Sequence, residues 1–582
     1  MKYLLTLLLT FPLAAQDVFV PPVPKGIARE GKVRTPREIP FPSEDGEWLR
    51  VQSPRFDVIS SATNDRTREL VKDIETLANA LGAPVSSRAT LFLFAKRRES
   101  QPYFDLLFAS AGATSAGAYV RHDGGGTMFI DGARGRRIER TAMHELIHDL
   151  LRQHDVVPPL WLEEGLAEYF SSAVVDDDRV IAGDLIPEHD AFFKRQSPMP
   201  LEKLFAIKPE SSEAASTAFY AQSWAVVEWL MYVDDKKFFP LLYDVARGTD
   251  LAAALKTHYD RSTREMESAV RVRDRGARRV TFDAARPSIP DAKPLDRATL
   301  LYELGDFLTH VAGAEKEAQR HFAEALRINP KHARTLAATG DLEGAVAAAP
   351  NDPEVHLMYA EVLMTTATGP FAGIFDPTAG DDEKFRRARR LATHALKIGG
   401  DEGRARGLIG TSMLVEDDLT PGIAELERAR VLLPQRMDFA LNLYAMHLAT
   451  GNRAKADALF AAAFANSRDK QILFAARNVL LAAETTRANQ FAAVGKLDEA
   501  AAIVRQLAAA TADARGRGDL ERQAAHLESI ATVNRHIARY NEAVALTNRG
   551  KKREAKKILD ELLKVATDPL VIQDVKRLRA EL

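Results

Sequence analysis

Apolar residues between positions 136 and 153 recur at every third or fourth residue, which is the period of one face of a helix. This stripe consists of Met143, Leu146, Ile147, Leu150 and Leu151. Two histidines that are four residues apart, His144 and His148, lie largely off the stripe together with Glu145. The pattern predicts a helix that buries one face in a core and presents two imidazoles and a carboxylate on another.

The sequence around this helix mixes strand-like and helix-like segments. Strands are expected at residues 55–60, 89–94, 117–121 and 127–131. A glycine-rich turn separates the last two, so they predict a hairpin that leads directly into the histidine helix. Further helices are expected at residues 65–81, 99–109 and 160–170. We therefore expect an α+β domain over residues 46–274, followed by a proline-containing linker over residues 275–297.

Residues 298–582 have helical spacing almost throughout and contain an internal repeat. A glycine is followed five residues later by an alanine at Gly313/Ala318, Gly340/Ala345, Gly451/Ala456, Gly495/Ala500 and Gly550/Ala555. The glycine would end the first helix of a pair, and the alanine would lie where the second helix packs against it. Residues 368–382 interrupt the pattern as an insertion. A helical bundle without repeats remains the alternative.

The N-terminus has the features of a secretory signal. Lys2 precedes a short apolar run, and Pro12 and two alanines follow it, which predicts a signal peptide over residues 1–15. Six prolines and no apolar period indicate an extended linker over residues 16–45. We expect an exported protein, periplasmic or secreted, with no integral membrane segment once the signal is removed.

The composition limits the partners and the metal ligands that the chain can have. The chain of 582 residues is too long for one core, and its net charge of −2 gives no electrostatic case for a nucleic-acid partner. Because there are no cysteines, any metal must be held by histidines and carboxylates. His122, His154 and His189 lack ligand spacing and are expected to be surface or structural residues.

Two imidazoles four residues apart on a helix are suited to zinc, and a third protein ligand would leave a position open for water. Glu164 and Glu163, on the next predicted helix, are the candidates for that ligand. Gly165 has no side chain and would let helices approach closely there. Glu168 lies one turn beyond Glu164 and is placed either to orient a ligand histidine or to be a solvent-exposed helical residue.

The residues 144–148 (HELIH) and 161–169 (WLEEGLAEY) together resemble the gluzincin metallopeptidases, most closely the peptidase MA-like group with its Trp-Leu-x-Glu-Gly-x-Ala element. The resemblance implies a zincin-like fold and one Zn²⁺ per chain, bound by His144, His148 and Glu164. It also implies that Glu145 is the general base toward a zinc-bound water. Residues 219–224 (FYAQSW) are similar to a downstream family segment, which makes Tyr220 the candidate stabiliser of an oxyanion. A packing role beside Trp224 is the alternative for Tyr220.

The aminopeptidase branch of gluzincins has a Gly-x-Met-Glu-Asn element that captures a free amine, whereas residues 117–120 here read GAYV, without a carboxylate. The departure favours an endopeptidase. The Gly/Ala pattern of the C-terminal half resembles tetratricopeptide repeats, most clearly at residues 305–330 and 540–569. Such repeats imply a solenoid that binds a protein substrate or partner.

Three functional hypotheses follow. In the first, an exported zinc metallopeptidase hydrolyses peptide bonds and its repeats bind a peptide or protein substrate. In the second, the repeats act as a non-catalytic scaffold and the peptidase-like domain has retained its zinc site. In the third, the same site hydrolyses a non-peptide amide or a cell-wall peptide.

Overall fold

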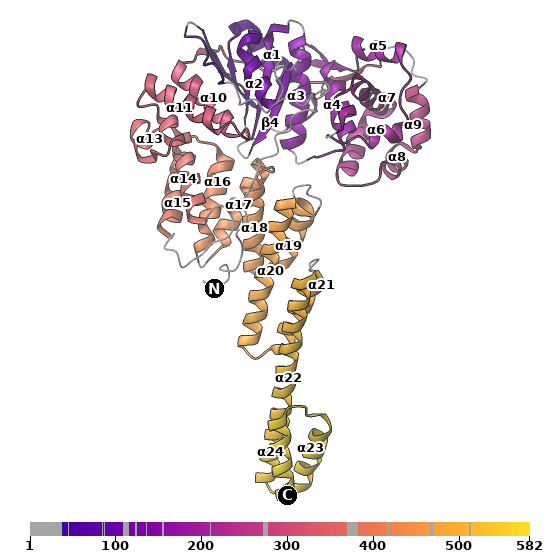
Figure 1. The fold of residues 1–582 in the computed structure, drawn as a ribbon, viewed down its shortest axis with the longest axis vertical. Helices are drawn as coiled ribbons and strands as arrows, with labels where there is room; N and C mark the ends of the chain where they lie inside the picture. Colours follow the sequence, from indigo (N-terminus) through magenta and orange to yellow (C-terminus); the bar gives the residue numbers. More distant parts are fainter. Residues whose placement is uncertain are drawn as a thin grey trace. The chain divides into compact units, whose positions relative to one another are not determined.

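The computed structural model describes residues 38–44, 46–83, 85, 88–108, 116–122, 125–134, 137–153, 156–209, 211–271, 278–368, 382–416, 418–465, 470–510 and 514–582. The expected signal peptide, nearly all of the first linker, His154 and nearly all of the insertion lie outside these residues. Two compact units divide the described chain, one of residues 38–368 and 382–443 and one of residues 444–582. The fold is mostly helical with a small mixed sheet (Figure 1).

Six strands of the described chain form a mixed sheet in the order β4-β5-β3-β2-β1-β9. They are β1 (Leu49–Gln52), β2 (Phe56–Ser60), β3 (Ala89–Phe94), β4 (Gly117–His122), β5 (Gly125–Asp131) and β9 (Lys293–Pro294). Strands β2, β3 and β5 are parallel, and β4 runs antiparallel to β5 at the edge. The expected hairpin is therefore present, and it supplies the edge strand of the sheet.

The sheet separates two hydrophobic cores because successive strand side chains point to opposite faces. In β3, Leu91 and Leu93 belong to the core that contains α1 (Asn64–Ala80) and α3 (Arg137–Gln153). Phe92 and Phe94 belong to a second core, with α2 (Arg97–Leu107), α10 (Arg297–Thr309) and α11 (Glu315–Ile328). The first helical pair of the C-terminal half is thus packed directly on the sheet.

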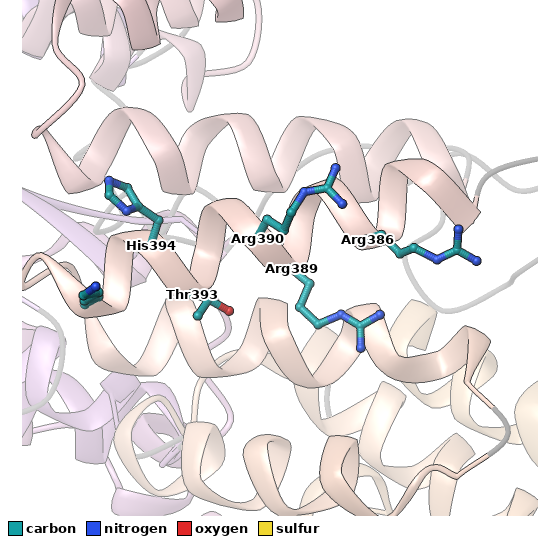
Figure 2. A pocket seen from close by; sticks show the side chains of 6 residues that line it. Arg386, Arg389, Arg390, Thr393 and His394 are labelled. Carbon is teal, nitrogen blue, oxygen red and sulfur yellow. The ribbon is translucent and has the colours of Figure 1, made fainter.

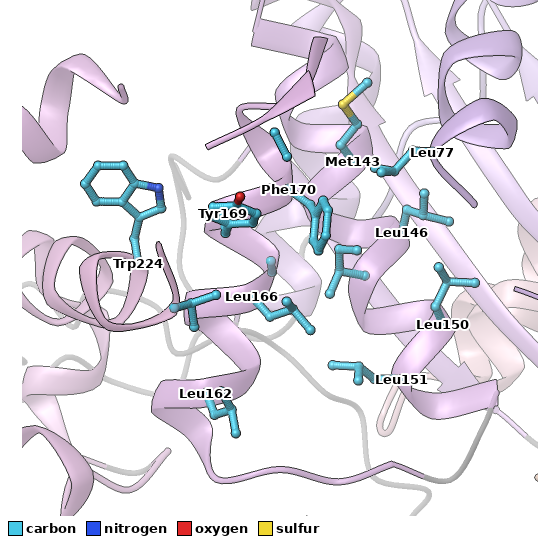
Figure 3. Packing of buried hydrophobic residues seen from close by; sticks show 14 of the residues in the cluster. Leu77, Met143, Leu146, Leu150, Leu151, Leu162, Leu166, Tyr169, Phe170 and Trp224 are labelled. Carbon is cyan, nitrogen blue, oxygen red and sulfur yellow. The ribbon is translucent and has the colours of Figure 1, made fainter. Parts of the chain in front are cut away.

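Helix α4 also belongs to the first core, where it packs against α3. Figure 3 shows Leu162, Leu166 and Phe170 of α4 on one side of α3, and Leu146 and Leu150 on the other side of α3, toward Leu77 of α1; all belong to the first core. The remaining elements of this region are α4 (Leu160–Ser171), β6 (Val174–Asp176), β7 (Arg179–Ala182), α5 (Pro187–Arg195), α6 (Leu201–Phe205), α7 (Thr217–Ala246), α8 (Leu251–Tyr259), α9 (Thr263–Arg271) and β8 (Val280–Asp283). A Cβ on Gly165 would lie 2.4 Å from the carbonyl oxygen of Ser223, so glycine is what allows α4 and α7 to approach this closely.

Residues 275–297, expected as a linker, contain two strands that pair with the preceding domain. Strand β8 pairs with β7 in a small second sheet, and β9 pairs with β1. The chain therefore runs along the first domain before it enters α10. No helix in the described part of the chain is long and apolar enough to cross a membrane.

The C-terminal half folds into helical pairs. Its helices are α10, α11, α12 (Ala333–Ala338), α13 (Leu342–Ala348), α14 (Pro353–Thr368), α15 (Asp382–Lys397), α16 (Glu402–Ser412), α17 (Thr420–Leu432), α18 (Met437–Ala449), α19 (Arg453–Leu459), α20 (Lys470–Ala493), α21 (Leu497–Ala510), α22 (Ala514–Asn548), α23 (Lys552–Val565) and α24 (Pro569–Glu581). All five glycines of the repeat have positive φ, and their alanine partners are all buried. The predicted roles of glycine and alanine in each pair are confirmed.

Candidate metal centre

Helices α3 and α4 build the site. Helix α3 matches the predicted range, and α4 starts directly after Pro159, whose fixed φ suits the residue that precedes a first helical turn. The apolar side chains of α3 hold it in the core, so His144, Glu145 and His148 turn toward α4 and the strand β4. The site is therefore fixed by two packed helices rather than by loops.

The structure brings His144, His148 and Glu164 together. His144 Nε2 lies 3.2 Å from His148 Nε2 and 3.5 Å from Glu164 Oε2, and His148 Nε2 lies 3.9 Å from the same oxygen. Zinc with nitrogen and oxygen ligands at its usual bond lengths separates the donor atoms of a tetrahedral site by about 3.3–3.5 Å. The two separations from His144 Nε2 are close to this range and the separation between His148 and Glu164 is longer, so the three side chains could hold one metal ion.

The environment of Glu164 points to a missing positive charge. Its side chain is fully buried, and neither carboxylate oxygen has a hydrogen-bond partner in the described chain. A buried carboxylate is strongly unfavourable unless a positive charge compensates it, and beside Glu164 that charge is either a protonated histidine of the cluster or a bound cation. Two imidazole nitrogens beside it complete a donor set that fits zinc.

Each histidine of the cluster also contacts a second carboxylate through its other ring nitrogen. Glu168 Oε1 lies 3.4 Å from His144 Nδ1, and Glu163 Oε1 lies 3.2 Å from His148 Nδ1. Such carboxylates fix the tautomer and orientation of a metal-binding imidazole. Of the two candidates for the third ligand, Glu164 is the one in the cluster, and Glu163 faces His148 from behind.

These supporting carboxylates are themselves paired. Arg152 donates to both oxygens of Glu163, at 3.0 and 3.2 Å. Glu168 Oε2 lies 3.4 Å from His189 Nε2 and 3.9 Å from Arg140. Burial raises the pKa of Glu168, but the hydrogen bond to His144 and the charges of His189, His144 and Arg140 outweigh it and bring the pKa to about 2. Glu168 therefore remains ionised behind His144.

Sequence spacing alone does not identify the residues that pair with Glu163 and Glu168. His189 comes from α5 and reaches Glu168 only through the tertiary fold, where its ring also packs against Trp224. Arg152 lies one turn after His148 on α3, so the two side chains are on the same face of that helix. Its contact with Glu163 could be predicted only if α3 and α4 were known to be adjacent.

Glu145 lies between α3 and the edge strand. Its side chain is almost fully buried, and burial raises the pKa of its carboxyl group although the two histidines oppose the effect. A Cβ added to Gly117 of β4 would lie 2.7 Å from Glu145 Oε1 and 2.4 Å from Thr141 Cγ2. Strand β4 can therefore approach Glu145 this closely only because residue 117 has no side chain.

Tyr220 lies in the first turn of α7, where it packs partly buried against the first core and its ring centroid lies 5.6 Å from that of Phe219. Burial and the negative charges of Glu164, Glu168 and Glu145 raise the pKa of its hydroxyl well above the ordinary value. The phenol therefore stays protonated at neutral pH and can donate a hydrogen bond. The structure places it in the electrostatic neighbourhood of all three carboxylates.

No protein-family model matches this chain, and no curated protein matches its sequence. The functional conclusion therefore rests on the geometry of the site itself.

Proposed function

We propose that this protein is a zinc-dependent metallopeptidase that cleaves within polypeptide chains. The observation that carries the proposal is the set of three donors at zinc spacing, with the unpartnered carboxylate of Glu164 and with Glu145 beside them. The sheet and its helices would then form a zincin-like domain, and the helical pairs a tetratricopeptide-like array. Zinc, when bound, would supply Lewis-acid polarisation of a carbonyl and acidification of water.

The protein side chains would handle the protons. Glu145 is suited to take the proton from the attacking water and to deliver it to the leaving amine, since burial keeps the pKa of its carboxyl group raised. Tyr220 would donate a hydrogen bond to the carbonyl oxygen as negative charge develops there. Glu163 and Glu168 would hold the imidazoles of His148 and His144 in place.

The edge strand supports binding of an extended substrate. In the described chain β4 pairs with β5 on one side only, and it passes directly beside Glu145. An extended polypeptide could add to such an edge by main-chain hydrogen bonds. Residues 117–120 carry no acidic side chain that would bind a free amine, which favours cleavage away from the N-terminus of a substrate.

Metal analysis combined with a digest of an unbiased peptide library tests the proposal. Wild type should contain one zinc per chain and cleave peptides, and Glu145→Gln should keep the zinc and lose about 10²–10⁴-fold in rate. Glu139→Gln is the matched control, because Glu139 lies on the same helix with a side chain that is 40% exposed. A zinc-loaded wild type that hydrolyses no peptide or protein would refute the peptidase.

A non-catalytic scaffold is the second candidate, and the extent of the helical pairs, from α10 to α24, favours it. It predicts a protein partner that wild type and Glu145→Gln bind equally and that neither cleaves. In a third alternative the same site hydrolyses a cell-wall peptide or another amide. We also propose export to the periplasm or the exterior, which N-terminal sequencing of the mature protein would test.

A further inference from the structure

Helix α5 contributes a histidine to the surroundings of the metal centre. The two buried side chains of this helix, His189 and Phe192, lie three residues apart and therefore share its inward face. An imidazole that faces a hydrophobic core is unfavourable unless it meets a polar partner. For His189, which is 4% exposed, such a partner is Glu168, whose Oε2 lies 3.4 Å from His189 Nε2.

Three other helices surround the first turn of α5 at this point. The ring of His189 packs on the fully buried ring of Trp224 from α7, with centroids 5.3 Å apart and an interplanar angle of 55°. Glu168 comes from α4. Arg140 of α3 lies 3.4 Å from Glu188, the residue before His189, and 3.9 Å from Glu168. The first turn of α5 therefore contacts α3, α4 and α7 beside the metal centre.

Each carboxylate oxygen of Glu168 faces a different imidazole. Oε1 lies 3.4 Å from His144 Nδ1, and Oε2 lies 3.4 Å from His189 Nε2. The last torsion of a glutamate side chain has broad energy minima, so contacts rather than rotamer preference set the plane of the carboxylate. An ionised carboxylate only accepts hydrogen bonds, so the hydrogen lies on Nδ1 of His144. In a neutral imidazole this leaves His144 Nε2 as the nitrogen that can bind a metal ion.

The other histidine of the cluster is supported from its own helix. Glu163, which contacts His148, accepts two hydrogen bonds from Arg152 at 3.0 and 3.2 Å. Arg152 and His148 both belong to α3. The carboxylate behind His148 is therefore held without any residue of α5.

The carboxylate behind His144 is held less firmly by α3. The contact between Glu168 and Arg140 spans 3.9 Å, and the side chain of Arg140 is 33% exposed. Ion pairs that solvent can reach are weak. If His189 were removed, Oε2 of Glu168 would lose its buried partner, and Oε1 would no longer be fixed toward His144.

We propose that His189 is a positioning residue of the metal centre, which holds Glu168 in the orientation that leaves His144 Nε2 available to zinc. This inference rests on the proposed zinc-dependent function and makes zinc affinity depend on α5. Outer partners of metal-binding histidines typically change metal affinity about 10–100-fold. Because His189 acts through Glu168, we expect a loss of about 10-fold, at the lower end of this range.

Histidines elsewhere in the chain could bind zinc weakly, so the test needs a control for them. The rings of His356 and His394 lie 4.6 Å apart. His394 lines a surface hollow of 490 Å³ on α15 together with Arg386, Arg389, Arg390, Thr393 and Lys397 (Figure 2). This lining contains four cationic side chains and no carboxylate. His394→Phe should therefore leave the affinity for zinc unchanged.

The test measures zinc affinity of the full-length protein by competition with a chelator. His189→Phe keeps an aromatic ring beside Trp224 and removes the ring nitrogens, whereas His189→Gln keeps an N–H group at a similar reach. Both replacements are made in the wild type and in Glu168→Gln. His258→Phe is the matched control, because His258 Nε2 lies 2.7 Å from Asp244 of another helix, as His189 does from Glu168. Thermal unfolding verifies that each variant is folded, and His189→Asn takes the place of His189→Phe if the latter does not fold.

We expect His189→Phe to weaken zinc about 10-fold, His189→Gln to recover most of this loss, and His258→Phe to have no effect. In the Glu168→Gln protein His189→Phe should cost less than about twofold, because coupled residues are not additive. A merely structural role for His189 would change zinc affinity equally in both backgrounds or not at all, and either result would overturn the inference.

The outcomes also separate this inference from the proposed function. Coupling between His189 and Glu168 in a protein that cleaves no peptide would refute only the peptidase. Additive effects in a protein that cleaves peptides would overturn only the role of His189. A wild type that binds no zinc would refute both.

Discussion

Replacement of Gly117 by alanine offers a sharp test of the site, because it adds one methyl group at the contact between β4 and Glu145. That methyl carbon would lie 2.4 Å from Thr141 Cγ2 and 2.7 Å from Glu145 Oε1. Ordinary contacts between carbon atoms are about 3.5–4.0 Å, so one of the two elements must move by roughly 1 Å. The neighbours that must move are Glu145, which is the proposed general base, and Thr141, which lies one turn before it.

The size of this shift determines the expected losses of stability and of catalytic rate. Strand β4 is held to β5 over six paired positions, so Glu145 and α3 are the groups expected to move. Overpacking of this kind destabilises a protein by about 1–3 kcal/mol. Misplacement of a catalytic group by about 1 Å reduces the rate about 100-fold, which is a barrier increase of about 2.7 kcal/mol. Zinc binding should persist, because the atoms nearest to the added methyl group belong to Thr141 and Glu145, which are not proposed metal ligands.

The assay compares kcat/KM on one cleaved peptide, zinc content and the free energy of unfolding. Gly126→Ala is the matched control, since its Cβ would lie 2.3 Å from the ring of Tyr119, in the same hairpin but away from Glu145. Both variants should lose similar stability, and only Gly117→Ala should lose about 100-fold in kcat/KM. If the two variants retained the same activity, β4 would not constrain the general base and our description of the site would be wrong.

Three further predictions concern charge. Glu164→Gln should weaken zinc binding more than about 100-fold in competition with a chelator, and an unchanged affinity would exclude Glu164 as a ligand. Glu163→Gln and Glu168→Gln should each weaken zinc about 10–100-fold in the same titration, and a variant without effect would show that its carboxylate does not orient a histidine. Burial raises the pKa of Asp306 to about 6, so the folded state binds the extra proton and stability falls as the pH rises from about 4 to 6. Asp306→Asn should therefore be more stable than wild type by about 1–2 kcal/mol above pH 6 in thermal unfolding, with no gain near pH 4; a constant difference at all pH values would refute this.

Periodic segments were predictable because their pattern reflects local geometry. The histidine helix, the hairpin and the helix at residues 160–170 appear within a few residues of the expected bounds, since each has a clear apolar period. The glycine and alanine spacing of the repeat was equally informative, because only glycine readily adopts the positive φ that ends each first helix. The pairs α14/α15 and α16/α17 lack this signature and were not individually predicted.

Features that depend on contacts between distant parts of the chain could not be predicted from the sequence. Strands β8 and β9 are too short for an alternation of apolar and polar residues to stand out, so the sequence of residues 275–297 predicted a linker. Strand β8 in fact pairs with β7 and β9 pairs with β1, both of which lie much earlier in the chain. The contact of Glu163 with His148 requires the relative placement of two helices, which spacing along one helix does not specify. The packing of α10 on Phe92 and Phe129 is likewise a property of the tertiary fold.

Burial and the like charges of Glu354 and Glu361 disfavour the ionised carboxylate of Asp306 at neutral pH, although Arg404 and Arg334 oppose the effect. An asparagine of nearly equal size would remove that cost. Functional sites commonly keep such locally unfavourable groups because the ligand compensates them. The same reasoning applies to Glu164, which is buried and whose oxygens accept no hydrogen bond within the described chain, so that a bound cation would compensate its charge. Under the proposed function that cation is zinc, bound by Glu164 together with His144 and His148.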